Sequence, residues 1–232
     1  MKQSRRGERA NRVCASIVET TERDALRAIE ESGPLADLVE LRMDYLPTAE
    51  LSLLLNARER PFIVTNRRKE DGGRYAGDEG SRLRILREAI DLGAEYVDVE
   101  MSAERSGVRD LIENKQKARV VLSFHDFQET PSSKKLQNLC DRMIRLGADV
   151  AKIVTFAASW EDNLRVLSLI PYARKKKQEI VAFCMGEKGK ISRVVSPLLG
   201  AAWTYASLSK GRAAAPGQMT IREIRDIWER LK

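Results

Sequence analysis

The sequence contains little histidine and cysteine, and it lacks long apolar runs. Cys14, Cys140 and Cys184 are odd in number and widely separated, so they match neither a disulfide framework nor a metal-ligand spacing and suit reduced thiols. No stretch approaches the roughly 20 apolar residues that cross a bilayer, and the basic N-terminus is followed by no apolar signal core. These absences predict a cytoplasmic protein with no metal site and no membrane partner.

Basic residues are in excess, with 41 Lys and Arg against 34 Asp and Glu and a net charge of +7. Such an excess can indicate nucleic-acid binding, but here the basic residues are mixed with acidic ones. The densest basic cluster, ARKKKQE at 173–179, falls where a helix would end before a strand, and cations are favourable there because of the helix dipole. We therefore expect no nucleic-acid partner.

Eight short segments rich in β-branched residues recur along the chain, about 27 residues apart, with helical patterns between them. This alternation predicts parallel βαβ units, and no linker divides the chain. The segments are 12–18, 38–43, 61–66, 96–101, 119–124, 150–156, 180–185 and 203–208.

The count of eight favours a closed barrel over an open doubly wound sheet, and no G-x-G-x-x-G follows the first segment. We predict an α/β fold in which residues 12–232 form a single (β/α)8 TIM barrel domain. Residues 1–11 are expected to be a flexible basic N-terminus. Helix ends are marked by Gly93 and Gly147 as C-terminal caps and by a capping box from Thr220 to Glu223.

Charged residues alternate with apolar ones in several of the predicted strands. Because side chains of a strand alternate between its two faces and the apolar face must meet the helices, Glu40 and Arg42 are expected to point into the barrel. The same rule sends Asp98 and Glu100 inward. Catalytic groups of barrels lie at the carboxyl ends of the strands, although inward charges can also neutralise one another as a polar plug.

Lys152 shares the face of Val150 and Val154 inside a predicted strand. Burial there favours a depressed pKa and a free amine that attacks carbonyl groups, unless the side chain snorkels to solvent. His125, the single histidine, ends the preceding strand and is expected to be its neighbour. It could be a structural residue, but an amine that forms imines beside an imidazole that transfers protons is a coherent catalytic pair.

Six motifs in order resemble the type I 3-dehydroquinate dehydratases, the Schiff-base lyases of the shikimate pathway. The resemblance runs from about residue 12 to the end of the chain. It implies 3-dehydroquinate as the substrate, a homodimer, and catalysis without a metal or organic cofactor. The motifs are ELRMDYL, TNRRKEDGG, SFHDFQETP, AKIVTF, ISRV and APGQ.

The resemblance implies that Lys152 forms an imine with the C3 ketone of the substrate. His125 would remove a proton from C2 and later protonate the departing C1 hydroxyl, while Arg193 would hold the carboxylate. Five further positions match residues of the family's substrate site: Glu40, Arg42, Arg67, Gln218 on a closing loop and Ser16 on the first strand.

Two departures from the family pattern stand out. An acid before two glycines usually orients the histidine, and here either Asp71 or Glu70 could take this role. Ala214 replaces a loop serine before APGQ, which removes one expected hydroxyl contact. Two alternative functions remain open at this point: a class I aldolase or transaldolase acting on a sugar phosphate, and a noncatalytic basic binding module.

Overall fold

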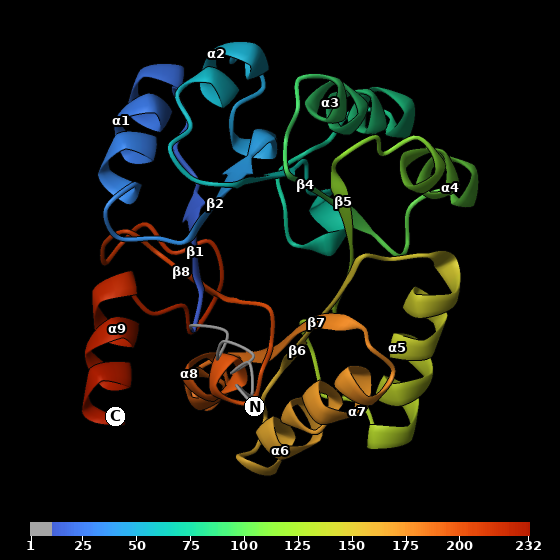
Figure 1. Ribbon diagram of the computed structural model, residues 1–232, viewed down its shortest axis with the longest axis vertical. Helices are drawn as coiled ribbons and strands as arrows, with labels where there is room; N and C mark the ends of the chain where they lie inside the picture. Colours follow the sequence, from blue (N-terminus) through green and yellow to red (C-terminus); the bar gives the residue numbers. More distant parts are fainter. Residues whose placement is uncertain (1–10) are drawn as a thin grey trace, which may run out of the picture.

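The computed structural model describes residues 11–232, and in it eight parallel strands form a nearly closed barrel surrounded by helices (Figure 1). Along the barrel wall the strand order is β7-β6-β5-β4-β3-β2-β1-β8, and each neighbouring pair is parallel. This confirms the predicted single TIM barrel. The strands are β1 Val13–Ile17, β2 Leu38–Arg42, β3 Phe62–Thr65, β4 Tyr96–Glu100, β5 Arg119–His125, β6 Val150–Phe156, β7 Glu179–Met185 and β8 Thr204–Ala206.

The wall has one seam, between β7 and β8, where no strand ladder forms among the described residues. The amide of Ala202, just before β8, donates to the carbonyl of Ile180 on β7 at 2.8 Å. β8 itself is shorter than predicted, because Ser207 pairs with Thr220 in an isolated bridge instead of extending the strand.

Helices cover the outside of the barrel, and within residues 11–232 none is long and apolar enough to cross a membrane. The segment between β6 and β7 forms two short helices that meet at Ser168. The helices are α1 Glu22–Ser32, α2 Leu51–Asn56, α3 Glu79–Asp91, α4 Arg105–Glu113, α5 Ser133–Leu146, α6 Glu161–Leu167, α7 Leu169–Lys175, α8 Lys190–Leu198 and α9 Ile221–Arg230, with 3-10 helices η1 Met43–Tyr45 and η2 Lys69–Asp71.

The inward face of the strands is apolar in its lower layer and charged in the layer above. Leu38, Tyr96 and Val150 belong to a buried apolar cluster inside the barrel, which also contains Trp203 with its ring 5.3 Å from that of Tyr96. Two residues further along the same three strands stand Glu40, Asp98 and Lys152, all buried. The alternation predicted from sequence is confirmed, and it brings charged groups toward the carboxyl ends of the strands.

The predicted helix ends are also found. Gly93 and Gly147 have φ of 81° and 93°, which is the left-handed conformation that glycine adopts without strain. All three cysteines are free and buried. Most of the predicted N-terminal segment, residues 1–10, lies outside the described part of the chain.

The start of α9 is closed by the predicted capping box. The Thr220 side chain accepts from the Glu223 amide at 3.2 Å, and the Glu223 carboxylate accepts from the Thr220 amide at 2.8 Å.

We expect Thr220→Ala to lower the free energy of unfolding by about 1 kcal/mol, because the Thr220 side-chain oxygen satisfies a helix donor that would otherwise be unpaired. Thr220→Ser, which keeps the hydroxyl, is the matched control in urea unfolding. Equal stability of the alanine variant and the parent would contradict the capping role.

Candidate active site

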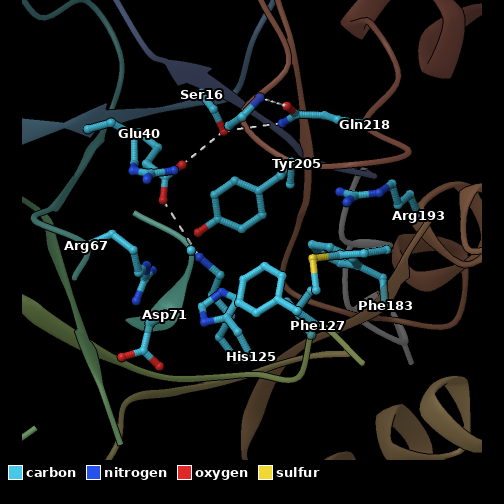
Figure 2. A pocket seen from close by; sticks show the side chains of 17 residues that line it. Ser16, Glu40, Arg67, Asp71, His125, Phe127, Phe183, Arg193, Tyr205 and Gln218 are labelled. Carbon is cyan, nitrogen blue, oxygen red and sulfur yellow. Dashed lines mark hydrogen bonds and ion pairs between the residues drawn. The ribbon is translucent and has the colours of Figure 1, made fainter. Parts of the chain in front are cut away.

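A pocket opens at the carboxyl ends of the strands, and Figure 2 shows the side chains that line it. Nine of the ten predicted site residues contribute to its wall, and Ala214 lies there too. The tenth, Glu70, is exposed on η2. The nine are Ser16, Glu40, Arg42, Arg67, Asp71, His125, Lys152, Arg193 and Gln218.

Lys152 reaches the pocket from the middle of β6. Its Nζ atom donates to Asp98 Oδ2 at 2.8 Å and lies 3.7 Å from Glu40 Oε1. The side chain is only 6% exposed, so it does not snorkel to solvent. Two carboxylates therefore compensate an amine that is held inside the pocket.

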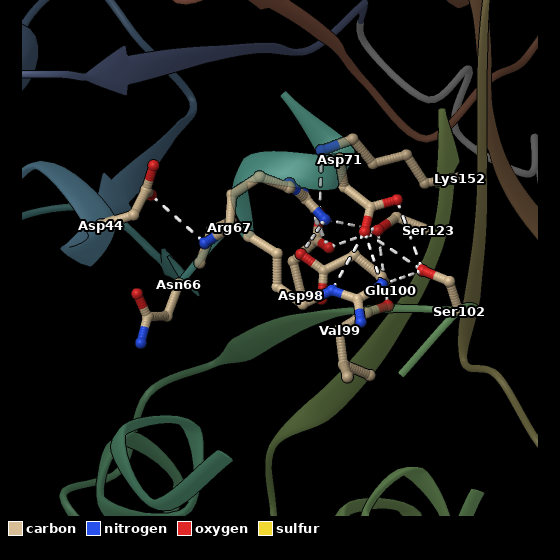
Figure 3. Close-up of polar contacts among 12 residues, drawn as sticks. Asp44, Asn66, Arg67, Asp71, Asp98, Val99, Glu100, Ser102, Ser123 and Lys152 are labelled. Carbon is tan, nitrogen blue, oxygen red and sulfur yellow. Dashed lines mark hydrogen bonds and ion pairs between the residues drawn. The ribbon is translucent and has the colours of Figure 1, made fainter. Parts of the chain in front are cut away.

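Behind Lys152, charges of alternating sign run across the barrel interior (Figure 3). Asp98 also pairs with Arg67 at 2.9 Å, and Arg67 donates to Glu100 at 2.8 Å. Glu100 in turn accepts from Arg82, a buried residue of α3 that the sequence analysis did not single out. Inward charges thus do neutralise one another, as the polar-plug alternative proposed, but they do so around the amine in the pocket.

This network fixes the charge state of Asp98. Burial acts to raise its pKa, but the Arg67 guanidinium and the Lys152 ammonium hold that pKa well below the usual 3.8. Ser123 also donates to Asp98 at 2.7 Å. Asp98 therefore stays ionised and remains a fixed negative partner for Lys152.

Glu40 connects Lys152 to the loop that follows β8. Its carboxylate accepts from Ser16 at 2.9 Å and from Thr65 at 3.0 Å. Gln218 donates to Ser16 at 3.4 Å and accepts from the backbone amide of Ala214 at 2.5 Å. The loop amide is thus tied to the carboxylate beside Lys152 through one serine hydroxyl, and Ala214 takes part through its backbone alone.

Three arginines line the pocket, and they differ in their partners. Arg42 forms a bidentate pair with Asp44 at 2.8 and 2.7 Å, and Arg67 is paired with Asp98 and Glu100. These two guanidinium groups are already compensated before any ligand binds. They can shape the pocket and offer their remaining N–H groups.

Arg193, on α8, is buried without a carboxylate partner among the described residues. Its guanidinium lies 4.4 Å from the centre of the Phe183 ring and donates weakly to the Pro216 carbonyl at 3.4 Å, while its Nε has no hydrogen-bond partner within residues 11–232. Burial lowers the pKa of this arginine to about 10, so the group is still charged near neutral pH. A buried and uncompensated cation at the pocket wall is suited to binding an anionic group.

His125 ends β5, next to Lys152 on β6. In the strand register Ser123 lies opposite Lys152 and His125 opposite Val154, so the predicted neighbourhood is found. The imidazole stacks on Phe127, with ring centres 6.1 Å apart. Burial, followed by the Arg67 and Lys152 cations, lowers the pKa of His125 well below its usual 6.5, so the ring is neutral and can accept a proton.

The predicted acid partner of His125 is not found at the imidazole. Asp71 accepts instead from Arg68 at 2.7 Å and from Ser102 at 3.1 Å, and His125 Nδ1 is buried without a hydrogen-bond partner in the part of the chain that the structure describes. The exposed Glu70 does not reach the pocket either. Because Arg68 stands three residues before Asp71 on the same turn, it binds this carboxylate locally.

Two contacts of the site were missed by the sequence analysis. Asp98 was placed inward, but its direct contact with Lys152 was not predicted. Tyr205 on β8 was not considered at all, although its ring centre lies 4.2 Å from Lys152 Nζ. The alternation of Trp203 and Tyr205 in the last predicted strand was the available signal, since both face the barrel interior.

Comparisons with known proteins agree on one family. A family model described as Type I 3-dehydroquinase matches residues 13–232. A 3-dehydroquinate dehydratase of Thermococcus gammatolerans is 41% identical over 215 residues, 93% of this chain and 96% of the relative. One of Desulfotalea psychrophila is 37% identical over 225 residues, covering 95% and 98%. The crystal structure of 3-dehydroquinate dehydratase from Geobacillus kaustophilus superimposes with a TM-score of 0.87 at 28% identity, covering 96% and 91%.

The lowered pKa of His125 can be measured directly, because this is the only histidine in the chain. We expect its NMR imidazole signals to titrate with a midpoint clearly below 6.5. As pH falls below about 6.5, the unfolded chain binds a proton that the folded chain does not, so the free energy of unfolding decreases until the folded pKa is reached. A midpoint at or above 6.5 would contradict the buried, cation-flanked environment.

Proposed function

Since the chain belongs to the type I 3-dehydroquinase family, we propose that it converts 3-dehydroquinate to 3-dehydroshikimate and water through an imine on Lys152. It is a hydro-lyase of the shikimate pathway, and the family match decides against the aldolase and binding-module alternatives. One observation supports the proposed mechanism above all. A buried lysine amine shares its pocket with the single, neutral imidazole and with an arginine that has no carboxylate partner among the residues that the structure describes.

The substrate is anchored by its carboxylate on Arg193. Binding supplies the negative charge that this guanidinium lacks, and its planar fork fits a carboxylate in two parallel hydrogen bonds. The other polar residues of the wall, Glu40, Arg42, Arg67, Ser16 and Gln218, then contact the hydroxyl groups of the ring. This arrangement places the C3 ketone beside Lys152.

The chemistry proceeds through a positively charged imine. The Lys152 ammonium condenses with the C3 ketone, and two of its protons leave with the ketone oxygen as water, which gives a protonated C=N bond that withdraws electrons from C2. His125, neutral beforehand, accepts the C2 proton and then donates it to the C1 hydroxyl, which departs as water. Hydrolysis of the imine releases the product. Because the imine is the electron sink, the reaction as proposed uses neither a metal nor an organic cofactor.

We also propose that two copies associate through α6 and α8, which lie side by side on the outside of the barrel (Figure 1). Large apolar side chains are exposed there: Trp160 is 61%, Leu164 69% and Ile191 50% exposed. A two-fold interface would cover the same patch on both subunits. A cytoplasmic location remains a prediction from the sequence.

Borohydride should inactivate the protein irreversibly when 3-dehydroquinate is present, since it reduces the imine to a stable secondary amine. Peptide mass mapping should then place the adduct on Lys152. Borohydride alone is the control and should leave activity unchanged. Turnover without any adduct, or an adduct on another lysine, would refute the Lys152 imine.

His125→Ala separates the two catalytic roles in the same experiment. This variant should still be trapped on Lys152, while turnover falls by about 10² to 10⁴, the usual effect of removing a positioned general acid and base. Undiminished turnover would return His125 to a structural role.

The proposed interface predicts that Leu164→Glu raises the dimer dissociation constant by at least about 100-fold, because an unpaired carboxylate would be buried at both symmetric positions. Sedimentation equilibrium measures this change. Leu53→Glu is the matched control, since Leu53 is exposed on α2 across the barrel (Figure 1). A monomeric parent protein, or a dimer that Leu164→Glu leaves intact, would contradict the proposal.

A further inference from the structure

Tyr205 is the one aromatic side chain of the described residues whose ring face lies against the Lys152 amine. It lies on β8, is 4% exposed and helps to line the pocket (Figure 2). Lys152 Nζ is 4.2 Å from its ring centre, within the range of cation–π contacts. The rings of Phe183 and Trp203 pack on it with centre distances of 6.2 and 6.4 Å, so the Tyr205 ring is held in place from two sides.

The ring, rather than the hydroxyl, is the part of Tyr205 that the structure connects to Lys152. The hydroxyl is buried and has no hydrogen-bond partner among residues 11–232. Its pKa is raised by burial and then by the Glu40 carboxylate, so it remains protonated and neutral. It supplies no charge that could compensate the amine.

Imine formation reduces the number of N–H donors on the nitrogen of Lys152. The ammonium has three N–H donors, which can serve Asp98 and Glu40 together. When the ammonium and the ketone condense, two protons leave with the ketone oxygen as water, and the iminium keeps one N–H. The positive charge persists, but it can be hydrogen-bonded to only one carboxylate.

An aromatic face attracts a cation without requiring any N–H from it. A flat iminium can also lie against a flat ring, which an ammonium cannot match in shape. The ring contact is therefore retained across the step in which a hydrogen bond is lost. The Tyr205 ring thus faces the nitrogen atom whose positive charge makes the C2 proton acidic.

We propose that the ring face of Tyr205 stabilises the iminium formed on Lys152 and thereby favours its formation over the free ketone. This inference rests on the proposed function, since it presupposes an imine at this lysine. It makes Tyr205 a residue in contact with the reacting nitrogen and assigns the effect to the ring.

Two variants separate the ring from the hydroxyl. Tyr205→Phe keeps the face and removes the hydroxyl, whereas Tyr205→Leu removes the face and keeps an apolar side chain. At saturating 3-dehydroquinate, we expect the leucine variant to accumulate about 5- to 30-fold less borohydride-trapped Lys152 per unit time and to lose kcat to a similar extent. The phenylalanine variant should stay within about 3-fold of the parent in both quantities.

Tyr96→Leu is the matched control for loss of a buried aromatic ring, because Tyr96 packs on Trp203 below the charged layer and is not part of the pocket wall. It should reduce the melting temperature without reducing the trapping rate. Comparing both leucine variants at a temperature where circular dichroism shows each to be folded separates chemistry from stability.

Equal trapping in Tyr205→Leu and the parent would overturn the inference, as would an equal loss in Tyr205→Phe and Tyr205→Leu, which would assign the effect to the hydroxyl. A parent protein that turns over no 3-dehydroquinate and is not trapped would instead refute the proposed function. The two failures are therefore distinguishable within one set of measurements.

Discussion

The contact between Lys152 and Asp98 at 2.8 Å determines how the rest of the site is built. An ammonium inside a barrel loses its hydration, and this loss must be offset by a partner that stays charged. Asp98 meets that condition only because Arg67 and Lys152 together hold its pKa low against the effect of burial. Removing any one of the three would take one opposite charge away from a buried partner, so these residues are coupled.

The same constraint separates the cations of the pocket into two groups. Arg42 and Arg67 have carboxylate partners within the protein, whereas Arg193 has none among the described residues. Within residues 11–232 one buried positive charge of the pocket is thus left without a carboxylate, and the proposed function assigns it to the carboxylate of the substrate. An anionic group that binds at Arg193 would also compensate the charge of this arginine, so the pocket favours ligands that carry such a group.

Much of the site could be predicted from the sequence, because alternation along a strand depends only on the backbone. That rule placed Glu40, Asp98 and Lys152 inside the barrel before any contact was known. It could not identify the partner of Lys152. The register sets Glu100 opposite Ser123 and Ser123 opposite Lys152, so counting along the strands would have paired Lys152 with Glu100.

The actual pairing depends on strand tilt and on a helix. Tilted strands bring Asp98 to the amine, while Glu100 is bound by Arg67 and by Arg82, which comes from α3. The partner of Asp71 could not be predicted from the sequence either, because its contact with Arg68 arises from a single 3-10 turn. Contacts between elements depend on packing distances that a one-dimensional pattern does not contain.

The seam between β7 and β8 is the place where the barrel wall resists separation least. Elsewhere in the wall a ladder of backbone hydrogen bonds resists separation of neighbouring strands, but in the described part of the chain β7 and β8 are joined through Ala202 and Ile180 without such a ladder. Arg193 follows β7 and Gln218 follows β8, so in the proposed complex the two ends of the substrate would lie on opposite sides of this seam. Separation of β7 from β8 would widen the pocket along the line that joins its proposed anion-binding and hydroxyl-binding ends. A ligand that contacts both sides of the seam would resist this separation.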